Sequence, residues 1–315
     1  MRYLEMGLAF AAVSFVVANA AFSLLTVFFW RAAKASGLRA GSLFLLRMAP
    51  AIGSASLVLG LVLPAYWSFE PRATSEKTGP MLVVFVLLTG ALVVAGLRRT
   101  LASWLVTRRL ERAWRAAAVG NASLGIRVRA YRVPSEMPLA ALVGVVRPRL
   151  FVSDRFLVAL SAEERQAVIE HEAGHLRSLD NLKRTAMRLA PDLFSFSSAA
   201  RELETAWAIA AEEEADDHAV GPDRSRSLDL ASALLKASRL APMYFATVSN
   251  FCDESTIARR VARLLKDESS VRRPARSLAP RVAWTVAFLG AAALLAVPAS
   301  RAAYTMSEAV IRLVQ

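Results

Sequence analysis

The chain has 315 residues, of which 55% are hydrophobic, and it carries a formal net charge of +13 with a mean hydropathy of +0.39. This composition is too apolar for a wholly soluble protein, and a single cysteine, Cys252, excludes an internal disulfide scaffold. The basic residues cluster beside apolar blocks, which favours a membrane topology signal over a nucleic-acid surface, so we expect no direct nucleic-acid partner.

Four apolar runs are candidates for crossing a lipid bilayer. They are residues 8–30, 49–67, 81–97 and 282–298. The last two lie near the lower length limit for a span, and the alternative for one of them is a buried core helix. Although Ala18, Asn19 and Ala20 resemble a signal-peptide cleavage site, the apolar run continues past them to Trp30. We therefore expect a retained anchor.

Clusters of basic residues flank these apolar runs on one side of the membrane, whereas the loop between the second and third runs has balanced charges. They lie between the first two runs (Arg31, Lys34, Arg39, Arg47), after the third (Arg98, Arg99, Arg108, Arg109, Arg112, Arg115) and before the fourth (Arg272, Arg273, Arg276, Arg281). Positive flanks stay in the cytoplasm. We expect a multi-pass protein of the inner (plasma) membrane, with its N-terminus outside and residues 98–281 in the cytoplasm.

Between the third and fourth runs, the pattern changes from a basic helix to short strands and then to helices. Residues 101–119 predict a helix that either lies on an anionic membrane surface or simply continues the third span. Gly120 and Gly125 end it, and the runs 126–133, 139–146 and 150–152 predict a small sheet. Helices are predicted over residues 161–177, 181–189, 198–220, 228–240 and 255–266.

The predicted fold class is α+β and mainly α, with polytopic membrane helices around a small cytoplasmic domain that has a short sheet. Residues 1–100 are expected to form three transmembrane helices, and residues 101–276 the cytoplasmic domain. Residues 277–315 are expected to form a fourth transmembrane helix and a short external tail.

The motif that carries chemistry is His171-Glu172-Ala173-Gly174-His175, inside the helix that Ser161 is expected to cap. Positions i and i+4 share one face of a helix, so both imidazoles can bind one Zn²⁺ ion. Glu172 is then placed to act as the general base on an activated water. The chain has only three histidines, which makes the motif specific. The alternative is a pair of surface histidines.

A catalytic zinc ion needs a third protein ligand, and the acidic run from Glu212 to Asp217 is the dense candidate. We expect Glu212 to bind the metal, and Asp216, one helical turn later, to accept the free N–H of a ligand histidine. Glu213 and Asp217 have the same spacing, so the register stays open by one residue. A solvated acidic face is the alternative to a site.

Two further residues have open assignments. His218 either stabilises the oxyanion of the reaction as a catalytic residue or is an ordinary surface histidine. Asp180 either orients His171 or His175, or caps the following helix.

Several segments together resemble the BlaR/MecR-type antirepressor metallopeptidases. They are residues 144–153 (GVVRPRLFVS), 160–164, the 171–175 motif, 180–182 and the Glu212…Asp216 pair. The resemblance implies a membrane-bound gluzincin whose HExxH helix and zinc domain face the cytoplasm, with a winged-helix transcriptional repressor as the usual protein substrate. The short expected tail lacks the penicillin-binding domain of the antibiotic sensors, so the trigger stays open.

Two other functions compete with regulatory proteolysis. Membrane peptidases of the HtpX and CAAX-protease type, which act in quality control or processing, are the nearest alternative, because they share the glutamate–x–x–alanine–aspartate pattern. A non-catalytic membrane scaffold that keeps a zinc fold is the other.

Overall fold

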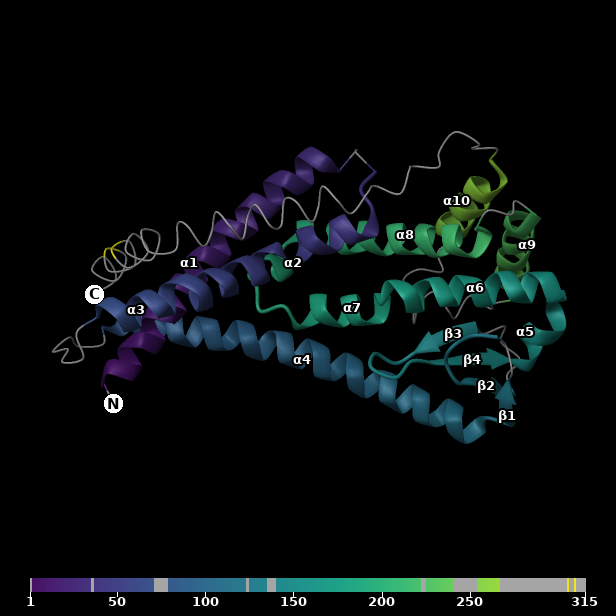
Figure 1. The fold of residues 1–315 in the computed structure, drawn as a ribbon, viewed down its shortest axis with the longest axis horizontal. Coiled ribbons are helices and arrows are strands. Elements are labelled where there is room, and N and C mark those ends of the chain that lie inside the picture. The colour runs from purple at the N-terminus through teal and green to yellow at the C-terminus, as the bar shows by residue number, and fades with distance from the viewer. Residues whose placement is uncertain are drawn as a thin grey trace.

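A computed structural model of the chain describes residues 2–34, 37–70, 79–122, 125–134, 140–221, 225–240 and 254–266, with Thr305 and Ala309. Long helices form one end of the molecule, and a small sheet with shorter helices forms the other (Figure 1). The expected class, α+β and mainly α, is confirmed. The fourth predicted span, residues 282–298, and Cys252 lie outside the described residues.

Three helical stretches among the described residues are long and apolar enough to cross a membrane. The first, Tyr3–Ala32, lies in α1 (Arg2–Ala33). The second, Ala40–Phe69, consists of α2 (Ala40–Leu57), η1 (Val58–Val62) and α3 (Leu63–Phe69). The third, Pro80–Ala117, is α4. The π-helical turn η1 has a local cause: Pro64 has no N–H to donate to the carbonyl of Gly60. The chain is a membrane protein.

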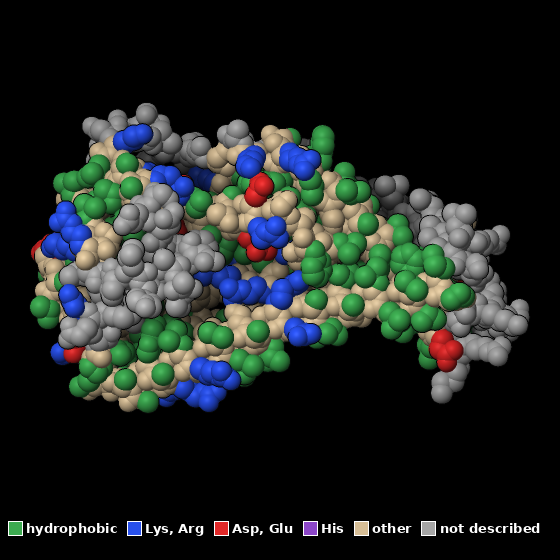
Figure 2. Space-filling model, turned by 180° about the vertical axis from the view of Figure 1, so that it is seen from behind, with side chains coloured by type: hydrophobic (Ala, Val, Ile, Leu, Met, Phe, Trp, Pro, Cys, Tyr) green, Lys and Arg blue, Asp and Glu red, His purple; other side chains and the backbone are tan. Residues whose placement is uncertain are grey.

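Helix α4 is continuous, so the basic stretch from residue 101 continues the third span, which was one of the two alternatives. Figure 2 shows hydrophobic side chains covering the helical end of the molecule, whereas Lys and Arg side chains gather toward its middle and its other end. The last turns of α4 dock on the sheet. Trp114 packs against Phe151 with ring centroids 5.4 Å apart, and Glu111 pairs with Arg149.

The sheet has the strand order β1-β2-β4-β3, in which β2 and β4 are parallel and the other pairs are antiparallel. Its strands are β1 (Gly120–Ala122), β2 (Ala130–Val133), β3 (Ala140–Val143) and β4 (Arg149–Ser153). β4 is central and buried, and β3 lies at an edge. β2 covers only the second half of the expected strand 126–133, and β1 begins at Gly120, where we expected only a helix break.

Helices follow the sheet in sequence and lie on one side of it. They are α5 (Asp154–Ala159), α6 (Ala162–Ser178), α7 (Asp180–Leu189), the short 3₁₀ turn η2 (Phe194–Phe196), α8 (Ser198–Val220), α9 (Ser225–Leu240) and α10 (Glu254–Leu265). The predicted capping box at the start of α6 is confirmed: Ser161 Oγ accepts from Glu164 N, and Glu164 Oε2 accepts from Ser161 N. α6 lies between the sheet and α8, whereas α7 lies beside α4 (Figure 1).

The largest hydrophobic core joins the first two membrane helices to α7 and α8. Its buried members include Trp30, Leu43 and Met48 from the membrane helices and Met187, Leu203 and Trp207 from the later ones. The start of α2 is also tied to α8, because the backbone N–H of Ala40 donates to Glu214 Oε1 at 3.0 Å. The membrane helices and the later helices therefore fold as one packed body.

The connection between α7 and α8 is held by polar side chains from all three membrane helices. Asn19 Oδ1 on α1 accepts from Leu193 N at 2.9 Å, and Arg99 on α4 donates to the carbonyl of Ala190 at 2.9 Å. Arg47 on α2, counted above among the flanking charges, is instead buried and pairs with Asp192 at 3.0 Å. This connection anchors the segment before α8.

Candidate metal centre

The close approach of α6 and α8 creates the site, and Gly174 permits that approach. A Cβ at position 174 would lie 3.0 Å from the Cα of Ala215 and 3.2 Å from the Cβ of His218, closer than ordinary contact. This accounts for a poor helix former inside the motif, which costs about 1 kcal/mol relative to alanine in an exposed helix. The histidines of α6 can therefore reach a carboxylate on α8.

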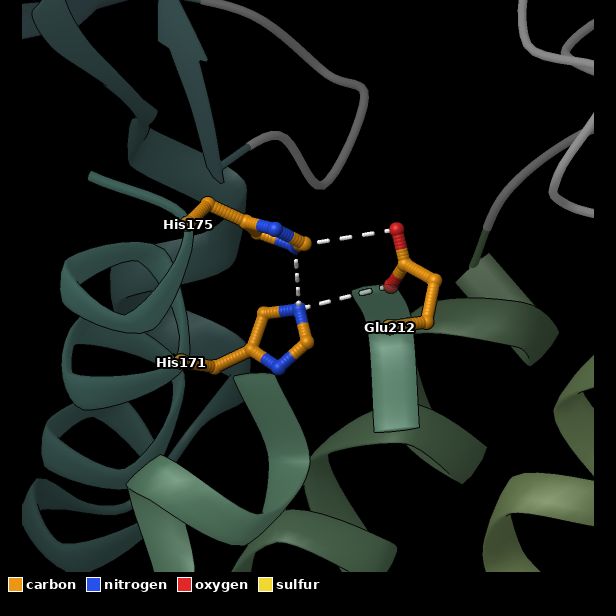
Figure 3. A group of neighbouring side chains, drawn as sticks. All are labelled: His171, His175 and Glu212. Carbon is orange, nitrogen blue, oxygen red and sulfur yellow. Dashed lines mark hydrogen bonds and ion pairs between the residues drawn. The ribbon is translucent and has the colours of Figure 1, made fainter. Parts of the chain in front are cut away.

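His171, His175 and Glu212 point toward one another across this contact (Figure 3). The two Nε2 atoms lie 3.2 Å apart, and Glu212 oxygens lie 3.5 Å from the Nε2 of His171 and 3.6 Å from that of His175. Donor atoms about 2.1 Å from a tetrahedrally bound Zn²⁺ lie about 3.4 Å from one another. The separations therefore fit three ligands of one such ion.

The outer nitrogen of each histidine faces a carboxylate. Nδ1 of His171 lies 3.0 Å from Asp216, and Nδ1 of His175 lies 2.8 Å from Asp180. An ionised carboxylate only accepts hydrogen bonds, so it favours the proton on Nδ1 and leaves Nε2 with a free lone pair. Two lone pairs and the Glu212 carboxylate then converge, which is a donor set suited to a cation.

The electrostatics of the metal-free cluster follow from its burial and its carboxylates. Burial acts to lower the pKa of His171, but Asp216 and Glu212 outweigh it and raise that pKa to about 9. Burial acts to raise the pKa of Glu212, yet the neighbouring His171 and Arg260 hold it below its ordinary value. In the absence of a metal, a proton on His171 therefore compensates the buried anions.

Of the two registers left open by the sequence, the structure brings Glu212 to the histidines. Glu213 points to Arg259 instead, with 3.8 Å between the charged atoms, and Asp217 pairs with Arg263. The acidic run is thus not a uniformly solvated face. Glu213 and Asp217 each pair with an arginine of α10, whereas Glu212 and Asp216 both face His171.

Arg260 on α10 is a site residue that sequence reasoning missed. It donates to Glu212 at 2.9 Å and to Asp216 at 2.9 and 2.6 Å, and it is 7% exposed. A signal was present in the spacing: Arg259 and Arg263 lie one helical turn apart with Arg260 beside them, and the acids that these arginines meet are also spaced by one turn, at 212 and 216 and at 213 and 217. Recognising it requires knowledge that α10 packs against α8.

The side chain of Glu172 reaches from α6 to β3, the edge strand of the sheet. Its Oε2 accepts a hydrogen bond from Leu142 N of β3 at 3.1 Å, and burial raises its pKa. Asn181, at the start of α7, donates to the carbonyls of Leu142 and Gly144 at 3.1 and 3.0 Å. Two consecutive helices therefore hold β3 beside the cluster.

Asp180 and His218, whose roles the sequence left open, lie at different distances from the cluster. Asp180 lies against His175 and makes no side-chain cap at the start of α7, which follows a left-handed turn at Leu179 (φ 56°). Within the described residues, the metal-ligand cluster comprises His171, His175 and Glu212 only. His218 lies on the last turn of α8 and is not brought into that cluster.

The comparison with known families agrees with this architecture. The sequence model of the BlaR1 peptidase M56 family matches residues 67–264, which is well over half of the chain. The matched region contains the motif helix, Glu212 and Arg260. No curated protein matches the chain.

Proposed function

Since the chain belongs to the BlaR1 peptidase M56 family, we propose that this membrane metallopeptidase is a zinc endopeptidase that cleaves a protein substrate on the cytoplasmic side of the membrane. The observation that carries the proposal is the convergence of two imidazole Nε2 atoms and one carboxylate, with an aspartate behind each imidazole. His171, His175 and Glu212 would hold the ion. Asp216 and Asp180 would fix the orientation of the two rings.

Glu172 is the proposed general base. A zinc ion in this cluster would supply Lewis-acid polarisation of the scissile carbonyl and of the attacking water. The Glu172 carboxylate would take the proton of that water and pass it to the leaving amine. Burial raises its pKa, which supports this role, because the carboxylate is then a stronger base and takes a proton from water more readily than an ordinary glutamate does. The proposal assigns no catalytic role to His218, which lies outside the cluster of His171, His175 and Glu212 among the described residues.

The outer edge of β3 is the proposed substrate-binding element. β3 pairs with β4 on one side only, and its Leu142 lies directly against Glu172. Because the N–H and the carbonyl of Leu142 already bond to Glu172 and Asn181, an extended peptide that adds to this edge would pair with Ala140 or displace these side chains. Its backbone hydrogen bonds would position the peptide without restricting its sequence. The scissile bond would then pass beside Glu172 and the histidine pair.

The cytoplasmic orientation and the regulatory role are supported by the basic flank and by the family. Arg108, Arg109, Arg112 and Arg115 follow the third span on α4 and are exposed, as positive flanks on the cytoplasmic side are. Because the chain resembles the BlaR-type antirepressors, we propose that its substrate is a transcriptional repressor of the winged-helix type. Regulatory proteolysis is then the biological activity.

The test compares the full-length chain with Glu172→Gln in detergent and in cells. Both proteins should bind about one zinc ion per chain, because Glu172 is not a ligand, but the variant should cleave about 10²–10⁴-fold more slowly. Comparison of cleaved proteins in cells should show one repressor fragment that depends on Glu172. Many cleaved membrane proteins would instead indicate quality control, and a wild-type chain that binds no zinc would overturn the proposal.

A further inference from the structure

We propose that Arg260 is a positioning residue of the metal centre: by holding Glu212 and Asp216 together, it makes the docking of α10 on α8 a determinant of metal affinity. The inference rests on the proposed function, since it takes His171, His175 and Glu212 as the zinc ligands. Arg260 itself has no contact with the metal position in this scheme and acts through the two carboxylates.

The hydrogen bonds of Arg260 link Glu212, a candidate metal ligand, to Asp216, which faces the ligand candidate His171. Nη1 lies 2.9 Å from Glu212 Oε2, while Nε and Nη2 bind both oxygens of Asp216 at 2.9 and 2.6 Å. The planar guanidinium fork suits this arrangement, because it can grip one carboxylate with two donors and still reach a second. The orientation of Glu212 is thereby coupled to the orientation of Asp216, which in turn faces Nδ1 of His171.

The charge of Arg260 is also needed where it lies. Glu212 and Asp216 are one helical turn apart on α8, and the Asp216 side chain is fully buried, so the two anions repel each other in a weakly polar environment. Without Arg260, the Glu212 carboxylate would be expected to turn toward solvent. Held by Arg260 at Oε2, it keeps Oε1 facing His175, 3.6 Å away.

The helix that carries Arg260 is docked by other residues as well. Val261 and Leu264 of α10 are buried in a core with Ala219 of α8 and with Leu230 and Ala231 of α9. Arg263, whose side chain is 30% exposed, pairs with Asp217, whose side chain is 66% exposed, at the rim of the same contact. This core can keep α10 in place when the guanidinium is removed, so the effect of Arg260 on the metal can be separated from folding.

The experiment measures metal binding by the full-length chain in detergent, free of metal at the start. Zinc affinity comes from competition with a chromophoric chelator, and the visible absorption of bound Co²⁺ reports the ligand geometry. The variants are Arg260→Gln, Arg260→Lys and the matched control Arg263→Gln. Thermal unfolding of each metal-free protein compares its stability with that of wild type, which separates an effect on the metal from a loss of folding.

Arg260→Gln should weaken zinc binding by about 10–100-fold and change the Co²⁺ spectrum, as expected for loss of a group that orients ligands. Arg260→Lys should recover part of the affinity, because it restores the charge but not the fork. Arg263→Gln should bind within about twofold of wild type, since it loses only an exposed pair. If both Arg260 variants bound zinc as tightly as wild type and gave the same Co²⁺ spectrum, this inference would be overturned while the proposed function would stand. A wild-type chain that binds no metal would overturn the proposed function and this inference with it.

Discussion

Glu172 and Leu142 are joined by a hydrogen bond of 3.1 Å from the backbone N–H of the edge strand to the carboxylate of the motif helix. Asn181 reinforces the same junction by donating to the carbonyls of Leu142 and Gly144. The candidate base, the candidate substrate strand and the metal cluster are therefore fixed relative to one another. The position of β3 should matter for hydrolysis more than for metal binding.

Asn181→Asp should lower kcat/KM for peptide hydrolysis by at least tenfold while leaving zinc content unchanged. The carboxylate is nearly the same size as the amide but cannot donate to the two carbonyls of β3, which it would repel. Asn181→Ser, which keeps one donor, should retain more activity. Steady-state kinetics and metal analysis on the same preparations check this prediction, and a variant that lost zinc would contradict it.

Removal of a cluster member should abolish metal binding, and removal of its neighbour should not. His175→Ala and Glu212→Ala each delete a converging donor, so zinc should fall from about one ion per chain to near zero. Glu213→Ala deletes only a carboxylate that faces Arg259. It is the matched control, and loss of zinc in this variant would place the ligand in the other register.

Local patterns predicted a large part of the fold. The start of α6 followed from Ser161 and Glu164, because a capping box is satisfied within four residues and needs no tertiary contact. The bounds of α8 were predicted for a similar reason, with Gly221 at its end. By contrast, α5 and β1 have six and three residues, too few for a hydrophobic period to be visible.

The parts of the site that depend on packing between helices were out of reach. The helical spacing placed His171 and His175 on one face, but it could not decide between Glu212 and Glu213, because the rotation of α8 against α6 depends on Gly174 and Ala215. Arg260 was missed for the same reason. It is separated from Asp216 by 44 residues and meets it only after α10 docks.

Zinc affinity should depend on pH through His171. In the metal-free protein, Asp216 and Glu212 raise its pKa to about 9, so below this pH zinc must displace a proton. The apparent affinity should fall about tenfold for each pH unit from 8.5 to 6.5. Asp216→Asn removes a principal cause of the raised pKa and should flatten the dependence. Chelator competition at three pH values measures it, and a flat wild-type profile would contradict the expectation.

Gly174→Ala should destabilise the protein, although alanine is the better helix former. The new methyl group would lie 3.0 Å from the Cα of Ala215, so α6 and α8 must separate, at a cost of about 1–3 kcal/mol. Gly90→Ala in α4 is the control, since nothing lies within 4 Å of its Cβ position. Unfolding in detergent compares the stabilities of the two variants. The separation of α6 and α8 should also weaken zinc binding in Gly174→Ala, whereas Gly90→Ala should bind zinc like wild type.

Arg47→Met should be among the most damaging changes outside the site. It leaves Asp192, which is fully buried, with only the donors of Ser195 and no cationic partner, at a cost of about 3–5 kcal/mol. Lys34→Met is the control, because Lys34 pairs with Glu202 on the surface, where an ion pair contributes about 0–1 kcal/mol. Unfolding of both variants in mixed detergent micelles measures the difference, and similar stabilities would show that the Arg47 pair contributes little.

The hydrogen bond from Ala40 to Glu214 has a mechanical consequence. Glu214 lies two residues after Glu212 on the same rigid helix, and Ala40 is the first residue of a stretch long enough to reach the opposite face of the bilayer. The shared hydrophobic core around Trp207 also joins α2 to α8, so we expect the two helices to move together. In the proposed orientation, a stimulus that tilts α2 would shift the carboxylate of Glu212 against the histidines, so such a signal would need no diffusible messenger to reach the proposed metal ligands.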